Sequence, residues 1–446
     1  MTVSSNKINN NLNPSGEANP SVFSLFLKYV SANVLGMIGY SCYILADTFF
    51  IARGIGSDAL AALNLVLPAY SLMNGTGLMI GMGAASRYTI SSAKPEGTLH
   101  RTIFTHALYL MVFAAVIFSS SGILFSDKIA TILGADIDTI GYATDYIRIL
   151  LMFSPLFLGN NLLLSFVRND GAPRLSMTGM IVGSLTNIVL DYVFIYPLGM
   201  GMTGAALATA TAPVISMLIM SVHFIKKRNH FRPVRTKPSL IRWRDICTLG
   251  VSSLITELSS GVVIIVFNYL ILGLNGNTGV AAYGILANIA LVLVSIYTGI
   301  GQGVQPIVSR YAGKNGERQR KDLRRYALTC SLIFALVSYL LIAVFAVPLA
   351  ELFNREHDPV LTKIASNGMR IYFISLFFSG INIVAAAFLS SVDRPKQAFV
   401  VSILRGFVLI IPVAWLMSVL FGLTGIWMAV PVTEACVCML ALIFLK

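Results

Sequence analysis

Four acidic residues lie inside or at the end of long apolar stretches, where a charge is costly: Asp47, Asp191, Glu257 and Glu434. A carboxylate in hydrocarbon costs at least ~2.5–3.5 kcal/mol, so each acid needs a partner, a water-filled cavity or a proton. No cation lies one helical turn away from Asp191, Glu257 or Glu434. We therefore expect these acids to hold a proton for part of the time, because burial disfavours the charged form.

A polar residue accompanies Asp191 on the same predicted helix. Asn187 precedes it by four residues, which places both side chains on one helix face. An amide can hydrogen-bond a carboxyl group in either protonation state, so the pair is predicted to be a proton-binding unit. The alternative is an acid that only ties neighbouring helices together.

The other three acids carry the same two interpretations. Asp47 ends a predicted span, where lipid headgroups would make an acid less costly. Glu257 follows two serines and a threonine, at positions 252 to 256, which either line a cavity or only cross-link helices. Glu434 lies near the middle of its span, after Pro431. All of them are candidates for cation coupling and for the wall of a substrate cleft.

The sequence lacks the motifs that indicate ATP binding or common enzymatic chemistry. The chain has no GxxxxGK[ST] loop for ATP, no GxSxG, no HExxH and no cluster of histidines. The five cysteines show no CxxC spacing, which argues against a disulfide framework and a zinc site. We therefore expect a protein that is not an enzyme and that needs no metal and no cofactor.

The composition indicates which elements must position the acids. Of 446 residues, 56% are apolar and 11% charged, and the mean hydropathy is +0.78. A soluble fold carries about 25% charged residues, so this chain cannot cover a water-facing surface of its size. The pattern predicts an all-α polytopic membrane protein. Its twelve transmembrane helices are expected near residues 22–47, 59–84, 102–125, 139–166, 175–197, 203–225, 245–272, 279–308, 326–353, 360–390, 397–420 and 423–445.

The 32 lysines and arginines alternate between the predicted loops. Only Arg53, Lys128, Arg355 and Lys363 fall in loops on one side of the membrane, and three more arginines fall within spans. The positive-inside rule then places both termini in the cytoplasm. It also accounts for the net charge of +13 without a nucleic-acid partner.

The chain divides into two halves. Residues 1–21 are rich in Asn and Ser and are expected to be a disordered cytoplasmic tail without a signal peptide. The longest polar stretch, 226–244, is predicted to be a cytoplasmic linker between an N-lobe, 22–225, and a C-lobe, 245–446.

Short motifs repeat between the halves at offsets of 220 to 223 residues. The matching pairs are Gly81-Met-Gly83 with Gly301-Gln-Gly303, Ser86-Arg-Tyr88 with Ser309-Arg-Tyr311, Arg148-Ile149 with Arg370-Ile371, and Thr203-Gly204 with Thr424-Gly425. With six spans in each repeat, the two bundles are predicted to be related by a pseudo-two-fold axis along the membrane normal. Such bundles leave a central cleft, as alternating access requires and a channel or receptor does not.

Three segments resemble the multidrug and toxic compound extrusion (MATE) family. They are ADTFFIARGIGSDALAALNLVLP at 46–68, FVRNDGAPRLSM at 166–177, and NIVLDYVFIYPLGMGMTGAALAT at 187–209. The resemblance implies a secondary active exporter of bulky, often cationic organic compounds, with twelve helices in two lobes and a proton or sodium gradient as its energy source.

The resemblance also implies roles for individual residues. One branch of the family has its cation site in the amino-terminal lobe, and its core matches Asp47, Asn187 and Asp191 here. Further members of that network match Tyr146, Asn161 and Thr209, and a seventh-span acid matches Glu257.

Two departures from the family bear on the mechanism. The segment Tyr29–Asn33 lacks the proline that members commonly carry early in the first span, which argues against a proline hinge. Residues 360–390 contain no acid, unlike the tenth span of the sodium-coupled branch. Proton coupling is therefore favoured, with sodium at Asp47 and Asp191 as the alternative.

A flippase of the same superfamily, moving lipid-linked oligosaccharides or cell-wall precursors, is the rival function. Such proteins usually line the cleft with several cations, and only Arg148, Arg370 and Arg405 are placed to do so here. We expect small organic molecules and the lipid bilayer as the partners of a monomer in a prokaryotic plasma membrane.

Overall fold

The structure is a computed structural model that describes residues 21–93, 100–312, 316–354 and 358–446. Apart from Ser21, the predicted tail lies outside the described residues, as does Arg355. Within the described ranges all regular structure is helical. The helices are α1 (Val22–Gly54), α2 (Ser57–Ser92), α3 (His100–Ile132), α4 (Ile140–Met152), α5 (Ser154–Asn169), α6 (Pro173–Ile195), α7 (Gly201–Ile225), α8 (Leu240–Arg310), α9 (Glu317–Phe353), α10 (Pro359–Tyr372), η2 (Phe373–Ser375), α11 (Leu376–Ser391), α12 (Pro395–Ile403), η3 (Leu404–Val408) and α13 (Ile410–Leu445).

Several helices are long and apolar enough to cross a membrane. The described residues contain nine of them, or ten if α4 and α5, which are bent by 51°, form one span. The 71-residue α8 leaves helical geometry at Gly276, and α13 does so at Gly422. Both glycines have positive φ, 59° and 58°, a conformation that costs glycine little. Each break lies where the sequence predicted a loop between two spans.

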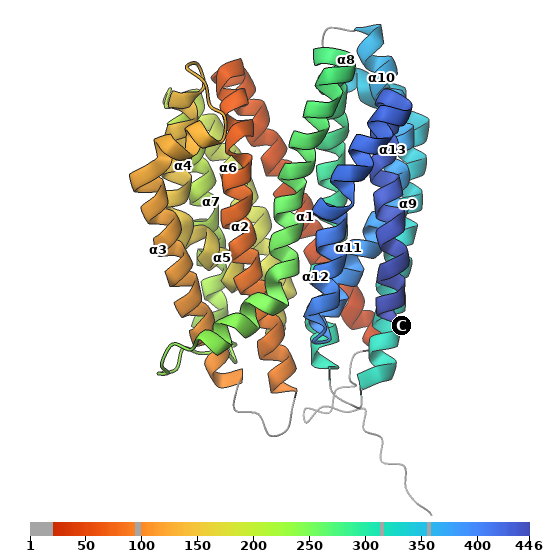
Figure 1. Cartoon of the computed structure of the whole chain (residues 1–446). Coiled ribbons are helices and arrows are strands. Elements are labelled where there is room, and N and C mark those ends of the chain that lie inside the picture. The colour runs from red at the N-terminus through yellow and green to blue at the C-terminus, as the bar shows by residue number, and fades with distance from the viewer. Residues whose placement is uncertain (1–20, 94–99, 313–315, 355–357) are drawn as a thin grey trace, which may run out of the picture.

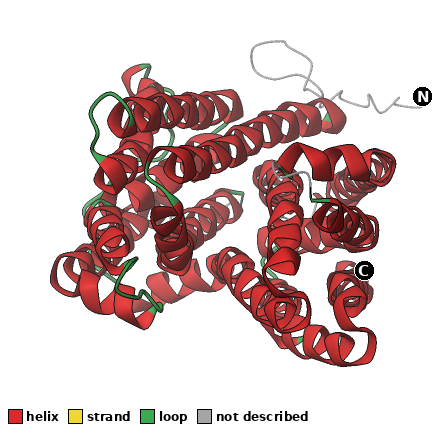
Figure 2. Ribbon diagram, turned by 90° about the horizontal axis from the view of Figure 1, so that it is seen from above, coloured by secondary structure: helices red, strands yellow, loops and turns green. Residues whose placement is uncertain are grey.

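The buried apolar residues form two separate clusters, which match the two groups of helices in Figures 1 and 2. We call them the first and the second cluster. The first runs from Ile51 at the end of α1 to Ile246 near the start of α8. The second holds buried residues from Phe267 onward, together with Phe26, Tyr29 and Val30 of α1. Thus α1 and α8 each contribute to both clusters.

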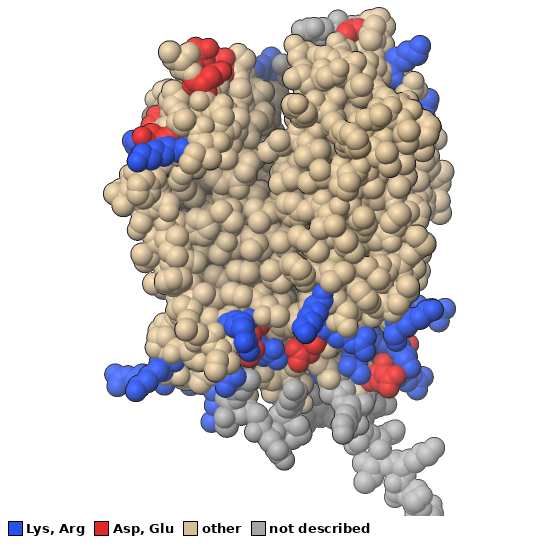
Figure 3. Space-filling view, in the orientation of Figure 1, with Lys and Arg blue, Asp and Glu red and all other residues tan. Residues whose placement is uncertain are grey.

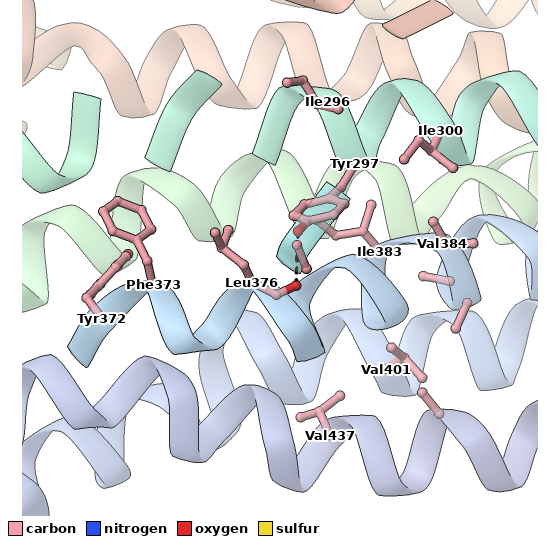
Figure 4. Packing of buried hydrophobic residues seen from close by; sticks show 14 of the residues in the cluster. Ile296, Tyr297, Ile300, Tyr372, Phe373, Leu376, Ile383, Val384, Val401 and Val437 are labelled. Carbon is pink, nitrogen blue, oxygen red and sulfur yellow. Dashed lines mark hydrogen bonds between the residues drawn. The ribbon is translucent and has the colours of Figure 1, made fainter. Parts of the chain in front are cut away.

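The second cluster is packed around an aromatic residue of α8. Figure 4 shows Tyr297 near Leu376 and Ile383, with its hydroxyl donating to the carbonyl oxygen of Leu376 at 3.1 Å. The side chain is fully buried, and the hydrogen bond satisfies the one polar atom that would otherwise be stranded among apolar neighbours.

Basic residues gather at one end of the molecule, at the bottom of Figure 3. We call it the basic end; it carries the segment 226–244, the start of α9 and the turn between α11 and α12. The other end carries the turn between α1 and α2, and there Figure 3 shows a groove between the two halves of the surface. We call this the opposite end.

The predicted linker begins as a non-helical strap. Residues 228–239 contain no helix, and α8 begins at Leu240. Asp170 holds this strap because its Oδ2 accepts from the backbone N–H of His230 at 2.9 Å. The rings of His223 and His230 also lie 2.8 and 2.9 Å from its carboxyl oxygens.

The two halves touch most closely where glycines face backbone at the basic end. A Cβ atom added to Gly299 or Gly303 of α8 would lie 2.7 Å from the Cα of Val34 or Val30 in α1. A Cβ atom on Gly250 of α8 would overlap the backbone of Met79 in α2. Only glycine permits helices to approach so closely.

A buried arginine strengthens this contact. The guanidinium of Arg168, at the end of α5, donates to Asn33 Oδ1 at 2.8 Å and to Gln302 Oε1 at 2.7 Å. The side chain is 2% exposed and makes no ion pair with any described acid. It also donates from Nη2 to Met82 Sδ of α2 at 2.9 Å, and so joins α5 to α1, α2 and α8 without a carboxylate partner in the described chain.

Two further arginines reach across the basic end. Arg310 of α8 donates from Nη2 to Tyr29 Oη and to the carbonyl oxygen of Asn169, both at 3.0 Å. Arg87 of α2 lies 3.4 Å from the carboxylate of Asp393, beyond α11. With the glycine contacts, these bonds close the molecule at its basic end.

Candidate functional site

The acid pair Asp47 and Asp191 lies between α1 and α6. The two side chains are 6% and 0% exposed, and Asp47 is close enough to act electrostatically on Asp191. Glycines on α1 make this approach possible, because Cβ atoms on Gly36 and Gly39 would lie 3.0 and 3.3 Å from side-chain atoms of α6. Both acids are therefore buried, including Asp47, for which the sequence left a position at the lipid headgroups open.

Polar groups from three helices surround the pair. With the Asn187 amide turned so that its nitrogen faces the acid, it donates to Asp191 Oδ2 at 3.2 Å. Its oxygen then accepts from the backbone N–H of Thr209 at 3.2 Å. The Tyr146 hydroxyl lies beside both the Asp47 carboxyl and the Thr209 hydroxyl. The structure thus brings together all five of these predicted residues.

One oxygen of each acid is left without a hydrogen bond. Asp47 Oδ1 and Asp191 Oδ1 are buried and have no partner among the described residues. A buried acceptor without a partner is costly, and a proton or a small cation bound between the two carboxyl groups would satisfy both. The carboxyl, hydroxyl and amide oxygens here suit a proton or a hard cation such as sodium.

A second polar network joins the two halves of the chain. Asn161 of α5 donates to Asn74 Oδ1 at 2.9 Å, and Asn74 Nδ2 donates to Glu257 Oε1 at 2.9 Å. The predicted residues Asn161 and Glu257 are therefore connected, but through an amide of α2 that the sequence analysis did not single out. Asn74 lies among glycines, a threonine and apolar residues at 73–78. An amide side chain in such a stretch is the feature of the sequence that could have indicated it, and it is buried in the structure.

Three tyrosines link this network to the acid pair. The hydroxyl of Tyr70 lies 3.0 Å from that of Tyr40 and 3.1 Å from that of Tyr43, and Tyr40 accepts from the amide of Asn74 at 3.3 Å. Tyr70 also lies within electrostatic range of Asp47. None of the three was predicted from the sequence. Tyr40 and Tyr43 are three residues apart and lie on one face of α1, a spacing that could have indicated these two.

Glu434 belongs to a different site and, although no cation lies one helical turn away from it, it pairs with an arginine from another segment. Its Oε1 accepts from Arg405 Nη2 at 2.6 Å and from Nε at 3.1 Å, and its Oε2 accepts from Asn382 Nδ2 at 2.6 Å. Arg405 lies in η3, a π-helical turn distant from Glu434 in the sequence. Spacing along one helix cannot reveal a partner on another.

Replacing Glu434 with glutamine is expected to destabilise the fold and to spare coupling. Removing one partner of a buried ion pair costs about 3–5 kcal/mol, because the other charge stays buried without compensation. Thermal unfolding of purified protein should show a lowered Tm that the double variant Glu434→Gln/Arg405→Gln partly restores. A normally stable Glu434→Gln protein without pH-driven transport would instead make Glu434 a coupling residue.

The described residues hold no cluster of three or more His, Cys, Asp or Glu side chains that could bind a metal ion. The acid pair supplies two carboxyl groups, and its other ligands are an amide and hydroxyls. The site is therefore lined mainly by oxygen atoms.

Comparisons with known proteins agree with this architecture. The sequence matches the MatE family over residues 33–193 and 252–416. It is 26% identical to the multidrug export protein MepA of Staphylococcus aureus over 424 residues, which cover 94% of this chain and 92% of that protein.

Two solved structures share the fold. One is an outward-facing multidrug resistance MATE family transporter of the MOP superfamily, with a TM-score of 0.88 and 22% identity over 95% of both chains. The other is a MOP superfamily transporter from Pyrococcus furiosus Vc1, whose binding pocket is described as having reverse polarity that suggests a different function. Its TM-score is 0.87, with 21% identity over 95% of both chains. The chain is therefore an integral membrane protein and belongs to the MatE family.

Proposed function

We propose that the protein is a secondary active multidrug exporter that exchanges protons for bulky, cationic organic compounds. The observation that carries the proposal is the acid pair Asp47 and Asp191, buried together with one oxygen of each left without a hydrogen bond in the described chain. Family members are transporters, and the name of the MepA relative supports multidrug export. No enzymatic activity is proposed.

In this proposal a proton and a substrate cation compete for the acid pair, and this competition couples their transport. Two nearby carboxyl groups in a medium of low dielectric cannot both be ionised at low cost, so they attract either a proton or a substrate cation. Ionised acids favour a lipophilic cation, and Tyr40, Tyr43 and Tyr70 offer aromatic surface beside them. Protonation removes the charge and weakens the hold on the cation.

The chain crosses the membrane twelve times in this proposal. The ten candidate spans become twelve when 240–310 and 395–445 are each divided at the glycine break. The MatE family matches twice, once in each half, and Arg87 and Arg310, which occupy equivalent positions in the repeat, each contact the opposite half. These observations support the pseudo-two-fold axis, the N-lobe and the C-lobe.

The basic end faces the cytoplasm in this proposal, because lysine and arginine are retained on that side. Both termini, the linker and the closed contacts between the halves are then cytoplasmic, and the groove opens outward. Bacterial relatives support a plasma-membrane location, and the protein acts as a monomer without a cofactor.

The coupling ion is a proton rather than sodium. No acid occurs within residues 360–390, whereas two adjacent acids share the site in the first half. Dye efflux from proteoliposomes, measured across a pH gradient without sodium and across a sodium gradient at equal pH, separates the two ions. Efflux driven only by the pH gradient supports the proposal, and efflux driven only by sodium contradicts it.

The flippase remains the second candidate, and the three arginines placed in the predicted spans bear on it. Arg148 and Arg370 are exposed, and they donate to Ser126 Oγ at 3.3 Å and to the carbonyl oxygen of Ala343 at 3.4 Å. Arg405 is paired with Glu434. This distribution favours export of cations over movement of anionic lipid-linked sugars. Turnover of a lipid-linked oligosaccharide by the reconstituted protein would support the flippase.

A further inference from the structure

A cavity of about 290 Å³ lies at the basic end of the second half, far along the chain from the acid pair. Its wall is formed by the first turns of α9, the end of α11 and the end of α13. These three helices meet where their apolar stretches end, and exposed apolar residues such as Met439 and Ile443 continue along α13. The cavity therefore opens at the level where the hydrocarbon of a bilayer gives way to headgroups.

Basic side chains dominate the wall of this cavity. Arg320, Lys321, Arg324 and Arg394 line it together with Lys446, against the single acid Glu317. Glu317 is bonded to Lys321 at 2.8 Å on the exposed rim. The four remaining cations have no acid within ion-pair distance in the described part of the chain. The site therefore presents a net positive charge.

Two of these arginines are held in position by the end of α13. Arg394 Nη1 donates to the carbonyl oxygen of Phe444 at 3.3 Å, and Arg324 Nη1 donates to that of Leu445. Each guanidinium has five N–H donors in a fixed fork, so both keep donors free for a second acceptor. A fixed guanidinium fork matches the oxygens of a phosphate group.

The rest of the wall is apolar. Phe388 and Leu389 of α11 are buried, and Val392 and Phe444 are partly buried beside them. A free inorganic anion makes no favourable contact with such an apolar surface. A phospholipid does, because its glycerol backbone and acyl chains follow directly behind its phosphate. Basic pockets between transmembrane helices bind anionic headgroups in this way.

We propose that this cavity binds the phosphate headgroup of an anionic phospholipid from the leaflet at the basic end. The guanidinium groups of Arg320, Arg324 and Arg394 contact the phosphate oxygens, and the aromatic rings of Phe388 and Phe444 contact the glycerol and the first acyl carbons. The proposal does not depend on the coupling ion or on the exported substrate.

The test compares two double variants with equal loss of charge. Arg320→Gln/Arg394→Gln removes cations that line the cavity. Arg318→Gln/Lys396→Gln removes exposed cations from the same two segments outside it. Binding is measured on purified protein by titrating phosphatidylglycerol into phosphatidylcholine nanodiscs that carry the protein, with native mass spectrometry of the retained lipid. Thermal unfolding checks that each variant is folded.

The cavity variant is expected to bind phosphatidylglycerol about 30-fold more weakly, since it loses two basic residues and each contributes about 1 kcal/mol to holding anionic lipid. The control variant should bind like the wild type, and glycerol 1-phosphate should not displace the lipid. An equal loss in both variants would mean diffuse attraction and would overturn the proposal. Displacement by glycerol 1-phosphate, with no preference for the lipid, would assign the cavity to a soluble anion instead. If the double variant fails to fold, Arg320→Gln alone decides, because Arg320 makes no ion pair with any acid of the described ranges that its loss would break.

Discussion

Replacing Asp191 with asparagine is expected to abolish proton-driven accumulation of substrate while the protein still inserts and folds. Asparagine has nearly the shape of aspartate and can still bond to Asn187, but it cannot gain or lose a charge. The exchange of a proton for a cation at the acid pair therefore stops. Because the side chain is fully buried, no bulk solvent group can replace it.

The expected size of the effect follows from the energetics of exchange. With the membrane potential clamped, one exchanged proton converts a gradient of one pH unit into a substrate gradient of about tenfold. Wild-type proteoliposomes should therefore concentrate a lipophilic cation about tenfold on the acidic side for each proton exchanged. Asp191→Asn should give a ratio of about one, since no proton is coupled.

The matched control is an acid that lies outside the site. Asp58, at the start of α2, is exposed, and Asp58→Asn removes the same charge from the same half of the chain. It should transport like the wild type. Coupled transport that persists in a correctly inserted Asp191→Asn protein would remove Asp191 from the mechanism, because an amide cannot carry the proton.

Replacing Gly250 with valine is expected to open the basic end. A side chain at this position would overlap the backbone of Met79, which cannot move aside as a flexible side chain could. Overpacking costs about 1–3 kcal/mol, and a cost of that size shifts a two-state equilibrium about 5- to 150-fold. The closed arrangement should lose population to one in which α2 and α8 separate.

Spin labels at Arg101 and Lys396, both exposed at the basic end, would report the separation by double electron–electron resonance. Gly261→Val is the control, because it places valine in the same helix where no atom lies within 4 Å of the added Cβ. The distance distribution should lengthen in Gly250→Val and stay unchanged in Gly261→Val. Unchanged distances in both would mean that the glycine contact does not limit closure.

The pairing of Asp191 with Asn187 could be predicted from the sequence, because the spacing of residues along a helix is a local property. Asp191 and Asn187 are four residues apart, so a helix places them on one face whatever surrounds it. Asp47 ends a predicted span, so the sequence left open whether it lies at the lipid headgroups, and only the fold shows that it is buried. The roles of Tyr146, Asn161 and Thr209 came from resemblance to a family and not from their own spacing.

Contacts between distant segments could not be predicted in the same way. Glu434 has no cation one helical turn away, because its partner, Arg405, lies on η3 and approaches through the fold. Asn74 was missed because its importance comes from two partners, Asn161 and Glu257, on other helices. Neither pairing leaves a periodic signal along the chain.

The sharpness of bends could not be predicted for a related reason. The predicted spans at 245–272 and 279–308 lie on either side of Gly276, but the chain turns there through one residue with positive φ, so both fall within α8. The predicted span at 139–166 is instead bent by 51° between α4 and α5. Apolar composition marks where a chain meets lipid but does not reveal how sharply it bends.

The most direct test of the account is whether binding of a substrate cation releases protons from the acid pair. Purified protein in a weakly buffered detergent solution with a pH indicator would be titrated with tetraphenylphosphonium across a range of pH. The wild type and Asp58→Asn should release protons in proportion to the cation bound, and Asp47→Asn/Asp191→Asn should release none. Proton release that is unchanged in the double variant would contradict competition at Asp47 and Asp191.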